Sequence, residues 1–140
     1  MPAFFDHLGV QFQYPESWTV ETSENDEGND VTVYSPEGAF WSLTIHDRGE
    51  PESLAEHAVA AMQEEYDELD CEEVDDAIAG QPLTAYDLNF YCLDLTNTAQ
   101  IRAFRRDGRT FLLIWQAEDR EFDLIAPVFR AITTSLIEAQ

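Results

Sequence analysis

The chain has 140 residues, of which 29 are acidic and seven are arginine, with no lysine, so its formal net charge is −22. A field of that sign repels phosphate backbones and anionic lipid, which argues against nucleic acid and membrane surfaces as partners. The length and the apolar fraction of 44% are those of a folded globule, so we expect a single domain over residues 1–140.

Alternating apolar and polar residues predict four strands before residue 50. The clearest strand places Val10, Phe12 and Tyr14 on one face and ends at Pro15. We expect the four strands over residues 10–14, 18–22, 31–35 and 40–46.

The period then changes to that of a helix. Pro51 suits a first helical turn, and an apolar stripe at steps of three and four residues continues through Leu69. Four further strands follow in the pattern, over residues 71–78, 83–95, 97–106 and 110–117. The first of them is acidic, as suits a sheet edge, and the last is apolar on both faces, as suits a central strand.

The last predicted element is a helix with Asp119 as its N-cap and an unbroken apolar line from Phe122 to Leu136. Pro127 should either kink this helix or mark its true first turn. The order of elements predicts an α+β domain, in which a mostly antiparallel sheet is packed by two helices.

A short element near the start carries a family resemblance. Tyr14, Pro15 and Trp18 stand as a "YP-x-x-W" pattern at the end of an early strand. With the order of elements, this pattern resembles the PsbP-like superfamily. The resemblance implies an α/β/α sandwich with a non-catalytic binding surface.

The end of the chain narrows this resemblance. Phe129, Ile132, Ser135 and Leu136 form an "F-x-x-I-x-x-S-L" element in the last helix, after an Arg-Asp-Gly-Arg turn that leads into an apolar strand. Both features are similar to the bacterial DcrB-like and Eag-chaperone-like branch. Its members imply a chaperone-like role without a catalytic residue or a cofactor.

Catalytic and metal-binding motifs give no competing signal. The sequence contains no P-loop, GxGxxG, HExxH or GxSxG pattern, so we expect no enzyme activity and no cofactor. His46, Asp47 and His57 could ligate zinc if they met in space, but no spacing requires it. The acidic turn over residues 25–30 lacks the glutamate that a calcium loop needs.

Four of the seven arginines lie within eight positions: Arg102, Arg105, Arg106 and Arg109. Strand alternation puts Arg102 and Arg106 on one face and Arg105 on the other. Their simplest role is to hold acidic side chains by ion pairs. The alternative is a site for a small anion or carboxylate, which guanidinium groups suit.

The function that these observations favour is a non-catalytic protein-binding or chaperone-like adaptor domain. A partner strand or helix would dock on a sheet face or edge, with the arginine hairpin and the aromatics Trp18 and Phe40 as binding residues. The alternative is a domain that binds a small ligand or a divalent cation, through the arginines or through the nine acids between residues 64 and 76.

The compartment and the acidity complete the expectations. No apolar run reaches the roughly 18 residues of a membrane span, and the start lacks the basic region of a secretory signal. Cys71 and Cys92 are predicted to be free, buried thiols, which suits the cytoplasm. The net charge fits two interpretations, a docking surface for a cationic partner or an adaptation to high salt.

Overall fold

Nine strands and two helices follow one another in the described part of the chain, residues 2–25 and 28–140 of a computed structural model. The helices are α1 (Pro51–Glu65) and α2 (Asp119–Glu138). The strands are β1 (Pro2–His7), β2 (Val10–Pro15), β3 (Thr19–Asn25), β4 (Gly28–Tyr34), β5 (Phe40–His46), β6 (Asp70–Ile78), β7 (Gln81–Cys92), β8 (Leu95–Arg106) and β9 (Arg109–Glu118).

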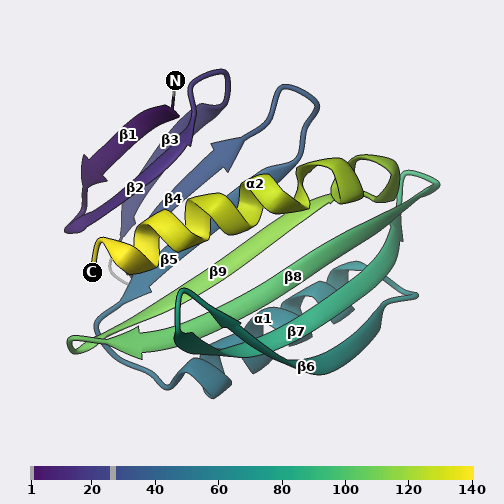
Figure 1. Ribbon diagram of the computed structural model, residues 1–140. Helices are drawn as coiled ribbons and strands as arrows, with labels where there is room; N and C mark the ends of the chain where they lie inside the picture. The colour runs from purple at the N-terminus through teal and green to yellow at the C-terminus, as the bar shows by residue number, and fades with distance from the viewer. Residues whose placement is uncertain (1, 26–27) are drawn as a thin grey trace.

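Seven of these strands form one antiparallel sheet in the order β3-β4-β5-β9-β8-β7-β6 (Figure 1). Strand β9, which is apolar on both faces, lies at the centre, and the acidic strand β6 lies at one edge. Both positions confirm the predictions from the pattern. The predicted fold class, a mostly antiparallel sheet with two packed helices, is confirmed as well.

Strands β1 and β2 form a separate two-stranded ribbon that is not joined to the main sheet. The ribbon lies on the same face as α2, above β3 to β5 (Figure 1). The ring of Phe12 packs against Phe5 and against the buried Trp41 of β5, at centroid distances of 4.7 and 4.9 Å. Burial of these aromatic rings is what holds the ribbon to the sheet.

Each face of the main sheet has its own core. The larger core lies under α2 and the ribbon, and contains Trp41, Trp115 and Phe129. The smaller core lies under α1, which covers only β7, β8 and β9 on the other face. The molecule is therefore an α/β/α sandwich in which one face of β3 to β5 has no covering helix. No helix in the described ranges is long and apolar enough to cross a membrane.

A buried hydrogen bond fixes α2 on its face of the sheet. The indole Nε1 of Trp41 donates to the hydroxyl of Thr133 at 3.0 Å, and that hydroxyl donates to the carbonyl of Phe129 at 2.9 Å. Both polar groups are thus satisfied inside the core, where an unpaired donor would cost about 1–3 kcal/mol.

Two predicted details are wrong, and the structure decides between the two alternatives for Pro127. Helix α1 ends at Glu65 and not at Leu69, because Tyr66 leaves the helix with extended backbone while its N–H still bonds to Met62. Helix α2 begins with Glu118 as its N-cap in place of Asp119; the Glu118 carboxylate accepts the N–H of Arg120. Its first turn therefore lies well before Pro127, which is inside the helix.

The cysteines also differ from the prediction. Both are free thiols, as expected, but Cys71 is exposed on β6 and Cys92 is half-buried at the end of β7. Cys71 lies on edge strand β6, whereas α1 packs mainly on β7, β8 and β9. No core therefore surrounds the Cys71 thiol.

Candidate functional site

The four clustered arginines lie in different surroundings, and Arg102 is the one inside the protein. It is 2% exposed; its Nε donates to Asp76 and one terminal nitrogen donates to Asp87, each at 2.8 Å. The other terminal nitrogen donates to the carbonyl of Tyr86 at 3.0 Å, and the guanidinium lies 5.8 Å from the ring of Trp115. The whole guanidinium is engaged, so Arg102 acts as a structural charge.

The carboxylate of Asp76 joins three elements. It accepts hydrogen bonds from Arg102 on β8 and from both terminal nitrogens of Arg130 on α2, at 3.1 and 3.2 Å. Burial raises the pKa of Asp76, but the hydrogen bonds and charges of Arg130 and Arg102 outweigh it, so the pKa lies below its ordinary value. Edge strand β6 is thereby tied to both α2 and the sheet centre.

Arg106 and Arg109 lie on the α2 side of the β8–β9 hairpin and bond to uncharged acceptors. Arg106 donates to the carbonyl of Ile137 at 3.0 Å and to the side chain of Gln81 at 2.6 Å. Arg109 donates to the carbonyl of Gly9 at 3.1 Å. These bonds join the end of α2, the β6–β7 turn and the β1–β2 turn to one hairpin.

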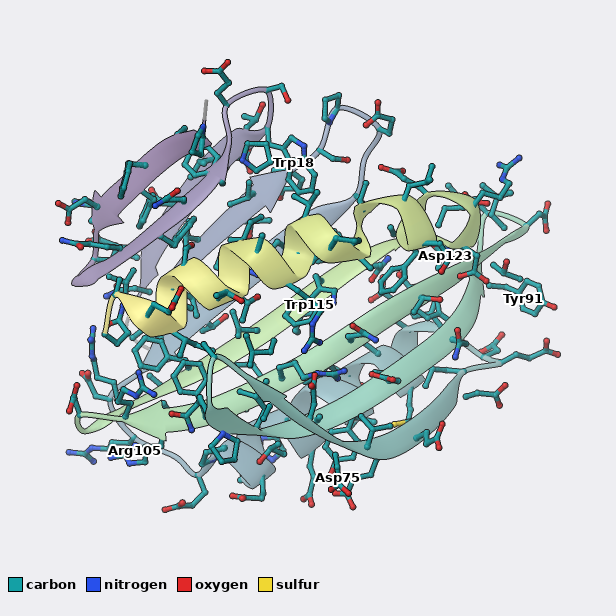
Figure 2. The ribbon with its side chains drawn as sticks, viewed as in Figure 1. Trp18, Asp75, Tyr91, Arg105, Trp115 and Asp123 are labelled. Carbon is teal, nitrogen blue, oxygen red and sulfur yellow. The ribbon has the colours of Figure 1, made fainter. Side chains whose placement is uncertain are left out.

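Arg105 lies on the opposite face, as the alternation predicts (Figure 2). It donates to the hydroxyl of Thr110 at 2.6 Å and to the carbonyl of Gly49 at 3.4 Å. In the described ranges no carboxylate forms an ion pair with Arg105, Arg106 or Arg109. The ion-pair role therefore belongs to Arg102, whereas the other three hold loops and chain ends, and an anion site at those three remains a prediction.

Trp18 and Phe40 lie on opposite faces of the sheet and do not form one surface. Trp18 is half-buried and packs edge-on against Phe129 of α2, with ring centroids 5.9 Å apart. Phe40 is half-buried on the uncovered face, 6.5 Å from the exposed Tyr34, and lines a cavity of about 350 Å³ beside α1. Trp18 thus anchors α2, and Phe40 faces a small cavity.

A groove of about 830 Å³ lies between β2 and α2. We call it the β2–α2 groove. Its floor and walls are mainly apolar, with Tyr14 and Pro15 on the strand side and Pro127, Val128 and Ala131 on the helix side. Glu16 and Glu138 contribute two carboxylates to its lining.

One polar contact sets the width of the β2–α2 groove. The hydroxyl of Ser135 accepts the backbone N–H of Gln13 at 2.9 Å and donates to the carbonyl of Ile132 at 2.7 Å. The open edge of β2 is therefore satisfied by a helix side chain in place of another strand. Ser135 and Ile132 belong to the "F-x-x-I-x-x-S-L" element, so the sequence did carry a signal for this contact.

A second surface had no signal in the sequence. The tip of the β7–β8 hairpin exposes Tyr91, Leu93 and Leu95, and Leu93 is 92% exposed. Figure 2 shows Tyr91 projecting from the far end of the molecule, away from Arg105. The alternating pattern ran from residue 83 through residue 95 without a break, so the tip was expected to be part of a strand.

The acidic and histidine candidates do not assemble into a metal centre. Within the described ranges, no group of three or more histidine, cysteine, aspartate or glutamate side chains could hold a metal ion. This covers the suggested site at His46, Asp47 and His57. Residues 26 and 27 of the acidic turn lie outside the described residues.

Comparisons with known proteins place this geometry in a fold family. No family model matches the sequence, and no curated protein matches it. Solved structures do: the cyanobacterial PsbP (CyanoP) of Synechocystis sp. PCC 6803 gives a TM-score of 0.63 at 12% identity, over 96% of this chain and 90% of that one. A protein of unknown function from Pseudomonas aeruginosa gives 0.52 at 7% identity, over 96% and 95%.

A third similar structure, from Bacteroides thetaiotaomicron VPI-5482, gives a TM-score of 0.58 at 13% identity, over 90% of this chain and 43% of its own length. At such identities the likeness shows the fold alone. The fold is PsbP-like, which confirms the expectation from Tyr14, Pro15 and Trp18. This fold is compatible with a non-catalytic domain.

Proposed function

We propose that the chain is a non-catalytic, chaperone-like adaptor domain that holds a segment of another protein in the β2–α2 groove. Within the PsbP-like proteins we place it in the DcrB-like and Eag-chaperone-like branch, because its last helix contains the "F-x-x-I-x-x-S-L" element. We also propose that it acts in the cytoplasm, because both of its cysteines are free thiols, as a reducing compartment would keep them.

The observation that carries the proposal is the apolar lining of the β2–α2 groove. A cavity of about 830 Å³ with apolar walls exposes surface that water disfavours, and burial of such surface drives association. Three prolines line it, Pro2, Pro15 and Pro127, and proline rings present rigid apolar surface that loses no conformational freedom when a partner binds.

The charges around the groove indicate the chemistry of the partner. The exposed Glu138 contributes a carboxylate to the lining, and the whole chain carries a net charge of −22. A segment with apolar side chains and at least one lysine or arginine is therefore complementary, and an acidic segment is repelled. Of the two interpretations of the net charge, the proposal therefore uses the docking surface for a cationic partner.

The test begins with capture of partners from an extract of the source cells by the tagged protein. Each captured protein is then purified, and its affinity is measured by calorimetry. Replacing Ala131, an exposed groove residue, by phenylalanine fills the groove with a ring, so we expect Ala131→Phe to weaken binding at least tenfold. The matched control is Ala61→Phe, the same change at an exposed position of α1 that does not line the groove.

The two variants separate the outcomes. Loss of binding in Ala131→Phe with normal binding in Ala61→Phe supports the proposal. Equal affinities of both variants would place the partner elsewhere, and the groove would lose its role. A partner that is chemically converted by the protein would contradict the non-catalytic assignment.

A further inference from the structure

The tip of the β7–β8 hairpin is built unlike the other tight turns. Four hairpins in the described ranges have two-residue turns in which both residues have positive φ, as type I′ turns require. Three of them have glycine at the second position: Leu8-Gly9, Ala79-Gly80 and Asp107-Gly108. The fourth is Leu93-Asp94, with φ of 53° and 65° and no glycine.

This turn is unfavourable in two independent ways. Left-handed backbone costs more at Asp94 than at the glycine that holds this position in the other three turns, and a leucine that is 92% exposed gives up nearly all the free energy of burial. Neighbouring Leu95 is 43% exposed and pairs with Cys92, so with Leu93 it extends the apolar surface on the α1 side of the tip. Tyr91 is 59% exposed, but strand alternation turns it to the opposite face. Strain together with an exposed apolar patch is typical of a functional surface.

A cleft beside the tip has one apolar wall and one acidic wall. Its volume is about 190 Å³; Leu93 and Leu95 contribute the apolar wall, while Glu37, Glu118 and Glu121 contribute carboxylates from the β4–β5 turn and the start of α2. The Glu118 carboxylate already pairs with Arg120 at 2.7 Å, so Glu37 and Glu121 are the acids that a partner would meet. Burial raises the pKa of Glu121, and the negative charges of Glu37 and Glu118 raise it further, against the hydrogen bond from Ser35. The carboxylates are thus crowded, and a cation from a partner would relieve their repulsion.

We propose that this acidic and apolar surface at the β7–β8 tip is a second docking site, which takes a basic amphipathic helix of another protein. Apolar side chains of the helix would pack on Leu93 and Leu95, and its flanking lysines or arginines would reach Glu37 and Glu121. No residue lines both the β2–α2 groove and this cleft, so the two sites are independent.

Charge decides against two other occupants. A second copy of the chain would bring the same carboxylates face to face, and the repulsion between two chains of net charge −22 adds to that. An anionic membrane surface is repelled for the same reason. A cationic helix gains from both the apolar patch and the acids.

The probe is an 18-residue synthetic peptide of leucine and lysine, with its leucines on one helical face and a fluorescent label. A second peptide of equal composition has its leucines scattered, which removes the amphipathic face and keeps the charge. Affinity is measured by fluorescence anisotropy at 0.3 M salt, where general attraction to an acidic protein is screened. We expect the amphipathic peptide to bind at least tenfold more tightly than the scattered one.

The variant Leu93→Ser/Leu95→Ser removes the apolar wall of the cleft and tests where the peptide binds without changing the net charge. We expect it to weaken binding of the amphipathic peptide at least tenfold. The matched control is Phe4→Ser/Leu124→Ser, which removes two apolar side chains that are 69% and 77% exposed elsewhere. The control should bind like the unmodified protein, and thermal unfolding checks that both variants fold.

The remaining outcomes overturn the proposal. Equal binding of the two peptides, or equal affinities of the two variants, would mean that net charge alone attracts the peptide. Tip-dependent binding to phosphatidylcholine vesicles without peptide binding would assign the tip to a lipid surface. Sedimentation as a dimer that the tip variant converts to a monomer would assign it to a second copy.

Discussion

Strand β8 ends in two hairpins that use their side chains in opposite ways. At the β8–β9 end, Arg105, Arg106 and Arg109 project around a glycine turn and donate to carbonyl and side-chain oxygens of four other segments. At the β7–β8 end, Leu93 and its neighbours surround a turn without glycine and remain exposed. The charged hairpin is fastened to its own protein, whereas the apolar hairpin is left for a partner.

The difference teaches that the type of residue does not by itself reveal a binding surface. Guanidinium groups are well suited to ligands, yet here they hold chain segments together. Leucine is a core residue by default, yet here it covers nothing. What separates the two roles is whether the polar or apolar requirement of the side chain is already met inside the chain.

Removal of Arg102 should have the largest effect on stability, because Arg102 is the buried arginine of the cluster. Arg102→Ala leaves the carboxylates of Asp76 and Asp87 without their shared cation. Loss of one partner of a buried ion pair costs about 3–5 kcal/mol. We expect a decrease of that size in the free energy of unfolding, measured by urea denaturation.

Arg105→Ala is the control for that measurement, since it removes the same charge from an exposed position on the same strand. Its cost should be about 1 kcal/mol or less. Equal losses in the two variants would show that net charge, and not the buried pair, governs the effect.

Substitutions in the turns of the two hairpins should change stability by an intermediate amount. Asp94→Gly should stabilise the protein by about 1 kcal/mol, because glycine relieves the strain of positive φ. Gly108→Ala should destabilise the protein by about the same amount, because φ at Gly108 is 79°, which strains an alanine. An added Cβ meets no atom within 4 Å, so the loss would come from the backbone and not from a clash. Urea denaturation measures both changes.

Asp94→Asn serves as the control for the lost charge in Asp94→Gly. It should recover only a small part of the gain. If Asp94→Gly leaves stability unchanged, the turn is not strained, and the tip proposal loses one of its two supports.

The smallest effect is expected at Glu121, beside the exposed tip. Its pKa is raised, so protonation favours the folded state, and this stabilisation is lost as the pH rises through the raised value. Glu121→Gln should therefore raise the melting temperature at pH 7, and the gain should shrink as the pH falls towards the ordinary value of 4.5. Glu68→Gln, which removes one exposed charge elsewhere, is the control for the change in net charge.

Much of the fold could be predicted from the sequence because period and turn chemistry agree along most of the chain. Strand β9 was assigned to the centre from its apolar faces, and β6 to an edge from its acids. Strand β1 was missed, since the alternation of Phe4 and Phe5 is recognisable only once the partner strand β2 is in place. Pairing across the sheet is tertiary information that a local pattern does not contain.

The candidate surfaces were less predictable for a physical reason. Trp18 and Phe40 each looked like exposed anchors, but the sequence does not show which face of the sheet a helix covers. The tip at Leu93 was hidden because the turn has no glycine, and a single aspartate between two leucines is a weak turn signal. A strained turn is thus the kind of feature that sequence patterns predict worst.

The bond between Gln13 and Ser135 joins residues 122 positions apart. During synthesis the ribbon leaves the ribosome long before α2, so the N–H of Gln13 has no helix partner until nearly all of α2 has been made. The rings of Phe5 and Phe12 can pack on Trp41 of β5 before that, because Trp41 is only 29 positions from Phe12. The ribbon is therefore secured in two stages, its apolar side by β5 and its outer edge by the last helix.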